Sequence, residues 1–343
     1  MNSLAGRIGV LGLVLLVSAA VSLGAEPRNL VDNPSLEDIP AADGLPRGWN
    51  GFHSEPAGGY SVAIVEPGHT GQRSLKVTGD GKFVVVRANR LDIDRTKRYR
   101  AEGWAKIEGH DTAAADVKFH YYAADGTYLG QSRIGFVAPR TPGWQRITVT
   151  DQIELFPKAT AIELAVALAG QGTAWFDDLR FTAREEARPA AVNWIANGDM
   201  EDIGADRPGG WHVATSEGGH VTCRSDDKIR HAGERSLYLK GNAEWSAAGS
   251  VKVPIDRTQA YLLTGFVRAK AGRAHLSIVY FEGDNFLGHT AAEPVAADET
   301  WQKQSLAIDA ADYPAATHVA AVASGAGDVE AWFDDLILTA KPK

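Results

Sequence analysis

Two adjacent aspartates stand inside an apolar, strand-like segment, and the same pair occurs twice in the chain. Residues 173–183 read TAWFDDLRFTA and residues 330–340 read EAWFDDLILTA. With side chains alternating between faces, Asp177 shares the core face with Trp175, Asp334 repeats the pattern, and the second aspartate of each pair points outward. An ionised carboxylate beside a core is costly unless it is paired. A bound cation would provide that partner.

A second acid recurs near the start of each copy. Glu37 closes the segment NPSLE, and Glu201 closes the segment NGDME. If the first and last strands of each copy run side by side, this glutamate and the closing aspartate converge. Carboxylates combined with backbone carbonyls, and no soft ligand, indicate Ca²⁺ rather than zinc. The alternative is that these acids accept hydrogen bonds from backbone N–H groups or arginine and that no metal binds.

The chain consists of two copies of one ordered series of motifs. HTGQRSLKV (69–77) matches HAGERSLYL (231–239), and NLVDNPSLEDI (29–39) matches NWIANGDMEDI (193–203). The period is far longer than a solenoid repeat, so each copy is expected to be a whole domain. We expect domains at 26–183 and 193–343, joined by a linker at 184–192.

Each copy has the pattern of short strands. Residues alternate between apolar and polar in YRAEGWAKI (99–107), DVKFHYY (116–122) and AIELAVAL (161–168), and Gly, Pro and Asp-Gly signals separate such segments. No long helical period occurs. The sequence predicts an all-β chain made of two tandem antiparallel β-sandwich (jelly-roll) domains.

Composition and the first residues restrict the classes of partner. The 343 residues carry a formal net charge of −8 with no basic block, which argues against nucleic-acid binding. Residues 1–25 combine an arginine, the apolar run IGVLGLVLLVSAAV and a small-residue end, which is typical of a cleaved signal peptide. The run is short for a membrane span. We therefore expect a secreted or periplasmic protein with no membrane span after cleavage.

The motifs, in their order, resemble a known family of domains. Each copy has Asn-x-x-x-Asn-x-x-[Leu/Met]-Glu, then Gly-Trp, Gly-x-Arg-Ser-Leu, Tyr-x-x-x-Gly-[Trp/Phe], Trp-Gln and Trp-Phe-Asp-Asp-Leu. This series resembles the carbohydrate-binding modules of families four, nine and twenty-two, which have the galactose-binding-like jelly roll. The resemblance implies a polysaccharide or glycan as partner. It also implies one structural Ca²⁺ per copy, held by Glu37 with Asp177 and by Glu201 with Asp334.

A sugar site in such a module needs aromatic rings beside polar side chains. In the first copy, Arg100, Glu102 and Trp104 alternate away from the core on one strand, and His120 and Tyr122 do so on the next. We expect the two rings of Trp104 and Tyr122 to stack on sugar while the other three side chains bond hydroxyl groups. The alternative is an ordinary mixed face of an antiparallel sheet.

The second copy has lost most polar groups on the corresponding face, which carries Leu262, Phe266 and Val279. This predicts weak sugar binding there, or a protein contact through the second domain. No catalytic motif is present, and the recurrent acids read as buried rather than as a pair flanking a cleft. The sequence predicts a non-enzyme that binds carbohydrate. Two alternatives stay open: a cell-envelope scaffold or adhesion protein, and a protein with hydrolytic activity on glycosyl bonds.

Overall fold

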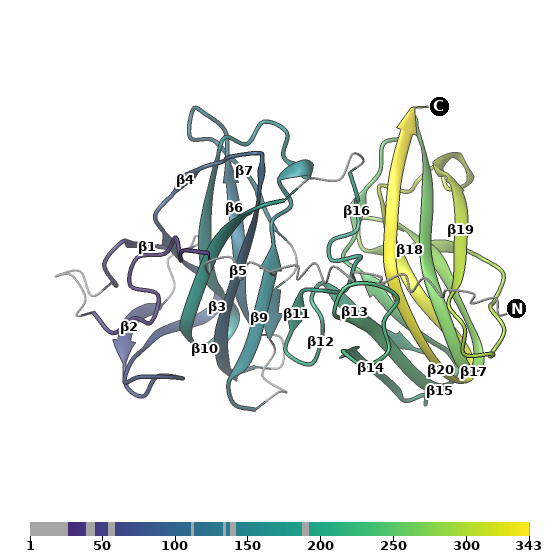
Figure 1. The fold of residues 1–343 in the computed structure, drawn as a ribbon, viewed down its shortest axis with the longest axis horizontal. Helices are drawn as coiled ribbons and strands as arrows, with labels where there is room; N and C mark the ends of the chain where they lie inside the picture. Colours follow the sequence, from purple (N-terminus) through teal and green to yellow (C-terminus); the bar gives the residue numbers. More distant parts are fainter. Residues whose placement is uncertain are drawn as a thin grey trace, which may run out of the picture.

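The computed structural model describes residues 27–38, 45–53, 59–110, 113–132, 135–137, 142–186 and 192–342. The expected signal peptide at 1–25 and the middle of the expected linker lie outside these residues. The described residues form twenty strands and two short 3₁₀ helices, arranged as two β bodies (Figure 1). No helix in this part of the chain is long and apolar enough to cross a membrane.

The first body contains ten strands and one 3₁₀ helix. They are β1 (Trp49–His53), β2 (Ser61–Val65), β3 (Ser74–Ala88), β4 (Leu91–Asp92), β5 (Lys97–Gly109), β6 (Ala114–Tyr122), β7 (Tyr128–Gln131), β8 (Gly135–Val137), β9 (Gln145–Thr150), η1 (Ile153–Leu155) and β10 (Ala161–Glu185). Every paired strand in the described chain is antiparallel to its neighbour.

The long strand β10 belongs to both layers of a sandwich. Its first half pairs with β6 and the end of β3, and its second half pairs with β5 and the start of β3. A register shift between Ala169 and Gln171 marks the change. The layers meet in the core, where the ring of Phe119 on β6 lies 5.1 Å from that of Phe181 on β10. We call these layers the β6 layer and the β5 layer.

Alternation along β5 follows the predicted pattern. Tyr99, Ala101, Gly103, Ala105 and Ile107 are buried, while Arg100, Glu102, Trp104 and Lys106 alternate with them and face away from the core. A fully buried large apolar side chain contributes about 1.5–3 kcal/mol, so this pattern fixes which face of the strand points inward. The predicted all-β sandwich is confirmed.

The second body repeats this plan with fewer strands. They are β13 (Trp211–Thr215), β14 (Val221–Asp226), β15 (Ser236–Ser250), β16 (Val253–Pro254), β17 (Gln259–Glu282), β18 (Asn285–Ala291), β19 (Gln302–Asp309), η2 (Ala310–Asp312) and β20 (His318–Pro342). β17 is one continuous strand where the first body has β5 and β6. The closing strand β20 again changes partners along its length.

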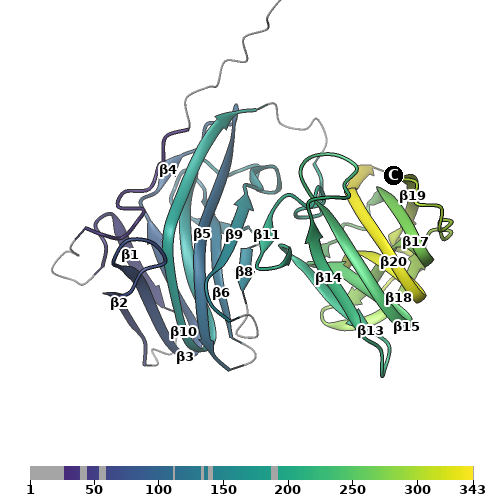
Figure 2. The same cartoon turned by 60° about the horizontal axis from the view of Figure 1, so that its bottom comes forward.

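Two short strands connect the bodies (Figure 2). These are β11 (Ile203–Gly204) and β12 (Arg207–Pro208), which pair with each other. Both lie between the bodies in Figure 1, and Figure 2 shows β11 there from another side. Gly204 also pairs with Ile147 of β9. The second repeat thereby extends the β5 layer of the first.

Candidate binding sites

The doubled aspartates sit at a β-bulge. Asp178 and Asp335 have φ values of +50° and +52°, and the register of β10 against β5 shifts between Asp177 and Arg180. Aspartate is one of the few residues besides glycine that adopt this left-handed conformation readily. The pair therefore occupies a position where the chain must bulge.

The bulge makes one sequence prediction wrong. Trp175 was expected to share the core face with Asp177, but Ala174 and Phe176 are the fully buried neighbours, and Trp175 is half-buried on the outer face. Trp332 likewise lies outside the second core, against the ring of Tyr238. The extra residue of a bulge reverses the alternation, so strict period two fails across it.

The first aspartate of each pair is buried and accepts three backbone N–H groups. Asp177 accepts from the N–H of His69 at 2.7 Å, of Thr70 at 3.1 Å and of Asp178 at 2.7 Å. Asp334 makes the three corresponding bonds, at 2.8, 3.2 and 2.8 Å. Burial raises the pKa of Asp177 to about 6 and that of Asp334 to about 7.

The recurrent glutamate holds the other end of the same loop. Glu37 Oε1 accepts from the N–H groups of Gln72 and Arg73, at 2.8 and 2.9 Å. Glu201 Oε1 repeats these bonds at 2.8 and 3.1 Å. Glutamate and aspartate thus meet at one loop in each repeat, as expected. Their partners are backbone N–H groups, which is the alternative to a bound metal stated above.

A calcium ion in the first repeat would need backbone oxygens. No three His, Cys, Asp or Glu side chains of the described chain gather as metal ligands. However, a Cβ placed on Gly68 would lie 2.4 Å from Thr70 O, 2.5 Å from Arg73 O and 2.9 Å from Asp177 Oδ2. Thr70 O, Arg73 O and Asp177 Oδ2 therefore gather around one point beside Gly68, and Ca²⁺ takes oxygen ligands of this kind. These residues fit calcium.

The second repeat has Arg230 where the first has Gly68. The Arg230 Nε donates to Gly233 O at 3.0 Å, and its Nη1 donates to Asp227 O at 2.8 Å. A residue with a Cβ cannot keep three oxygens in the arrangement around Gly68. Both repeats have the aspartate and the glutamate, but only the first gathers Thr70 O, Arg73 O and Asp177 Oδ2 beside a glycine. We call this arrangement the Gly68 cradle, and only the first repeat therefore fits calcium.

The second aspartate of each pair holds a histidine. Asp178 Oδ2 lies 2.7 Å from His69 Nδ1, and the His69 ring stacks on Trp104 with ring centroids 4.0 Å apart. The second repeat has the same arrangement, with His231 stacked on Phe266 at 3.5 Å. One face of the Trp104 ring is thus covered by protein, which leaves less of it for a sugar than expected.

The five residues expected to form a sugar platform do not lie together. Arg100, Glu102 and Trp104 lie on the outer face of β5. His120 and Tyr122 lie on β6 in the other layer and are only 6% and 4% exposed. The outer faces of the two layers point in opposite directions, so the prediction of one platform is wrong. Alternation shows which side of a strand faces the core but not which layer holds the strand.

On the β6 layer, His120 and Tyr122 belong to a polar cluster around a buried glutamate. Glu163 Oε1 accepts a hydrogen bond from the Tyr122 hydroxyl and lies 3.3 Å from His120 Nδ1. Arg87 Nη1 and Arg90 Nε each lie 3.6 Å from its carboxylate. We call this set, with the adjacent Tyr128, the Glu163 cluster.

Sequence reasoning missed four members of the cluster: Glu163, Arg87, Arg90 and Tyr128. Glu163 is the single acid in AIELAVAL, and its neighbours Ile162 and Leu164 are fully buried in the core. Alternation therefore places Glu163 on the outer face, and that signal was available. Arg87 and Arg90 come from the end of β3 and the turn after it, and only strand pairing brings them to this site.

The electrostatics of the Glu163 cluster favour an ionised carboxylate. Burial opposes ionisation, but hydrogen bonds from His120 and Tyr122 and the charge of Arg87 outweigh it, so the pKa of Glu163 is lowered. Burial and the bond to Glu163 raise the pKa of Tyr122. Within the described chain, the buried His120 Nε2 has no hydrogen-bond partner. Such an atom is costly unless a ligand or water satisfies it.

Aromatic rings border the cluster. The Arg90 guanidinium lies 3.4 Å above the Tyr122 ring, which prevents that ring from stacking on a sugar from that side. Tyr128 packs edge-on against His120 and Tyr122 and is 50% exposed. Tyr128, rather than Tyr122, is the ring available to a ligand.

The second repeat lacks this cluster. Glu163 pairs with His120 in the first body, whereas Ala320 pairs with Val279 at the same place in the second. Arg87 is replaced by Gly249, according to the pairing of β15 with β20. Because the second sandwich forms without these groups, the fold does not require them.

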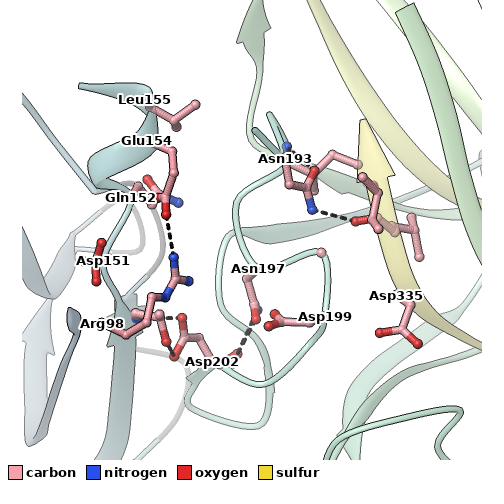
Figure 3. A pocket seen from close by; sticks show the side chains of 15 residues that line it. Arg98, Asp151, Gln152, Glu154, Leu155, Asn193, Asn197, Asp199, Asp202 and Asp335 are labelled. Atoms are coloured by element: carbon pink, nitrogen blue, oxygen red, sulfur yellow. Dashed lines mark hydrogen bonds and ion pairs between the residues drawn. The ribbon is translucent and has the colours of Figure 1, made fainter. Parts of the chain in front are cut away.

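A cleft of about 250 Å³ separates the two repeats (Figure 3). Arg98 donates to Glu154 at 2.8 Å on one side, while Asp199 projects from the other. The buried Asp202 crosses the junction and accepts from the Thr150 N–H at 2.7 Å and the Thr150 hydroxyl at 3.1 Å. Burial and the charge of Asp199 raise the pKa of Asp202 to about 6.

No family model matches this sequence, and a comparison with curated proteins finds no match. Similar solved structures include the tandem CBM22-1–CBM22-2 domain of Xyn10C from Paenibacillus barcinonensis, with 13% identity and a TM-score of 0.36 over 88% of this chain and 95% of that one. Carbohydrate-binding modules are thus among the structural neighbours, as predicted.

Two further neighbours match about half of the chain. TmCBM61 in complex with β-1,4-galactotriose has 15% identity and a TM-score of 0.30, over 46% of this chain and 99% of that one. The Stig cyclase Fisc from Fischerella sp. TAU has 13% identity and a TM-score of 0.35, over 45% and 99%.

Proposed function

We propose that this protein is an exported, non-catalytic carbohydrate-binding protein whose sugar site is the Glu163 cluster of the first repeat. The observation that carries the proposal is a group of charged, hydrogen-bonded residues on an outer sheet face. The second repeat forms its sandwich without such a group, so the fold does not require it. Ionised Glu163 is an acceptor for sugar hydroxyls, and Arg87 and Arg90 are donors beside it. The unpartnered His120 Nε2 would gain a partner from a bound hydroxyl.

The surroundings of the cluster suit a sugar ring. Phe83, Val85, Ala165 and Ala167 form a small apolar group on the same face, and Phe83 is its partly exposed member, so the Phe83 ring would contact the C–H groups of a sugar. The exposed Tyr128 ring would stack on one face of it. Apolar walls with a few convergent polar groups are the usual composition of a small-molecule site.

Glu163 is the only carboxylate in the cluster, whereas most glycosidases need two that flank the scissile bond. This supports binding without hydrolysis. Export is supported by the pattern of residues 1–25. We also propose a structural Ca²⁺ at the Gly68 cradle, with Asp177 as ligand and Glu37 holding the loop that carries Thr70 and Arg73.

Affinity electrophoresis through gels containing a panel of polysaccharides tests this function. We expect at least one glycan to retard the chain and Tyr128→Ala to weaken that binding by about tenfold or more, since a stacked ring buries apolar area worth over 1 kcal/mol. Tyr60→Ala is the matched control, because Tyr60 is 44% exposed against 50% for Tyr128. Its retardation should equal that of the wild type.

Glu163→Gln should also weaken binding, with thermal unfolding used to check that the variant is folded. Equal retardation of wild type, Tyr128→Ala and Glu163→Gln would place the site elsewhere. No retardation by any glycan would reject carbohydrate binding on this panel.

A contact with another protein through the second repeat is the second candidate function. Four of the six exposed large hydrophobic side chains in the described chain belong to this repeat: Val213, Trp245, Phe286 and Ile337. Phe286 on β18 is 62% exposed. A partner that co-purifies with the wild type but not with Phe286→Ser would support this function.

A further inference from the structure

The outer face of the β5 layer carries four arginines, and the second repeat closes it into a cavity of about 280 Å³. Arg100 comes from β5, Arg146 from β9, and Arg180 and Arg184 from β10. Arg235 reaches the cavity from the second repeat. The site therefore exists only where the two repeats meet.

The cavity contains more cations than its own acids neutralise. Five arginines and three glutamates line it. Glu102 accepts from Arg146 at 2.6 Å, and Glu201 already accepts two backbone N–H groups. Arg100 and Arg184 are exposed and form no ion pair among the residues that the structure describes, although the charge of Arg100 also acts on the buried Asp202. The cavity thus has an excess of positive charge, although the chain as a whole has a formal net charge of −8.

The duplication shows that the sandwich does not need two of these cations, whereas Arg146 and Arg184 correspond to lysines, Lys303 and Lys341, in the second repeat. Arg100 corresponds to Leu262, and Arg180 corresponds to Ile337, at matching places on β17 and β20. The second repeat thus builds the same layer with apolar residues at these positions. Two arginines that the fold does not require, gathered at one cavity with three further arginines, point to a ligand.

We propose that this cavity binds an anionic sugar unit of the glycan, carrying either a carboxylate or a sulfate ester. A planar guanidinium binds both groups through paired, charge-assisted hydrogen bonds. The acid-lined cleft at the same junction (Figure 3) contains Asp151, Glu154, Asp199, Asp202 and Asp335 and would repel such a group. This proposal rests on the proposed function only in taking the ligand to be a sugar. The residues of the cavity are distinct from those of the Glu163 cluster.

Affinity electrophoresis of the full chain in polygalacturonate, dextran sulfate and neutral dextran tests the site. We expect retardation by at least one anionic polymer, and Arg100→Ala/Arg184→Ala should weaken it by about tenfold or more, the effect of losing charge-assisted bonds. Both side chains are exposed, so the variant should fold. Lys240→Ala/Lys303→Ala removes two exposed charges from the second repeat and is the matched control.

Retardation by polygalacturonate alone assigns a carboxylate, and retardation by dextran sulfate alone assigns a sulfate ester. If neither anionic polymer retards the chain, or if the lysine variant loses as much binding as the arginine variant, the anionic site is overturned. Tyr128→Ala reports on the Glu163 cluster and separates the two sites. If Tyr128→Ala has no effect but the arginine variant does, the cavity survives and the Glu163 site fails.

Discussion

Saturating Ca²⁺ is expected to raise the melting temperature of this protein by several degrees over the chelated form. At a hundredfold excess over its Kd, a ligand that binds only the folded state stabilises it by about 2.7 kcal/mol. For a domain of this size, each kcal/mol shifts the melting temperature by roughly 2–4 °C. The physical cause is neutralisation of the buried Asp177 carboxylate by an ion that also meets Thr70 O and Arg73 O. Calorimetry with and without chelator measures the shift.

The two repeats supply the control for this prediction. Asp177→Asn and Gly68→Ala should abolish the calcium-dependent shift, the first by removing a charged ligand and the second by filling the space between the oxygens. Asp334→Asn should leave it intact, since Arg230 stands at the position of Gly68 in the second repeat. Titration calorimetry should find one ion per chain. Two ions per chain would contradict this assignment, and none would reject the calcium site.

The two sandwiches could be predicted from the sequence because duplication and period-two alternation are both local signals. Ala101, Ala105 and Ile107 lie in the core as their spacing indicates. The recurrence of Glu37 and Asp177 correctly indicated one meeting point, because residues needed by the fold recur when a domain is duplicated. Such reasoning works for whatever the two copies share.

Two kinds of feature could not be predicted in this way. They are the features found in only one repeat and those that depend on pairing between distant strands. The bulge at Asp178 reverses the alternation, and no period-two pattern contains that reversal. The separation of Trp104 from Tyr122 depends on which layer holds each strand, which is a property of long-range pairing. Glu163 could have been found as the one acid in an apolar strand, but its partners Arg87 and Arg90 could not, since β3 meets β10 only in the fold.

Acidification from pH 8 to pH 5.5 in the presence of chelator is expected to stabilise the protein. Burial, with the nearby charge of Asp335, outweighs the backbone hydrogen bonds and raises the pKa of Asp334 to about 7 from an ordinary value of 3.8. The folded state therefore binds a proton that the unfolded state releases in this range. Stability from this group is fully present below the unfolded pKa and is lost as the pH rises through 7. Its share of the gain is about 2 kcal/mol, since one pKa unit is worth about 1.4 kcal/mol.

Denaturant unfolding at a series of pH values measures this effect. Asp334→Asn should make the curve shallower between pH 8 and pH 5.5, because its titrating group is gone while the side chain keeps an acceptor oxygen for the loop. The slope that remains belongs to Asp177 and Asp202, whose pKa values are both raised to about 6. Glu330→Gln is a suitable control, as Glu330 is an acid of the same strand whose pKa is lowered by Lys270. A wild type that loses stability over this range would contradict the assigned burial of Asp334.

Calcium should change this pH dependence in only one repeat, and that asymmetry links the two predictions. Asp177, with a pKa of about 6, adds its own stabilisation on acidification when the cradle holds no ion. A bound Ca²⁺ keeps Asp177 ionised, so its contribution disappears, and acid instead weakens the site by competing for the carboxylate. Asp334 has no ion to hold and keeps its contribution. Calcium-saturated protein should therefore keep the pH dependence that comes from Asp334, which is the part that Asp334→Asn removes. If calcium abolishes the Asp334 contribution as well, both repeats bind the ion and Arg230 does not prevent binding in the second repeat.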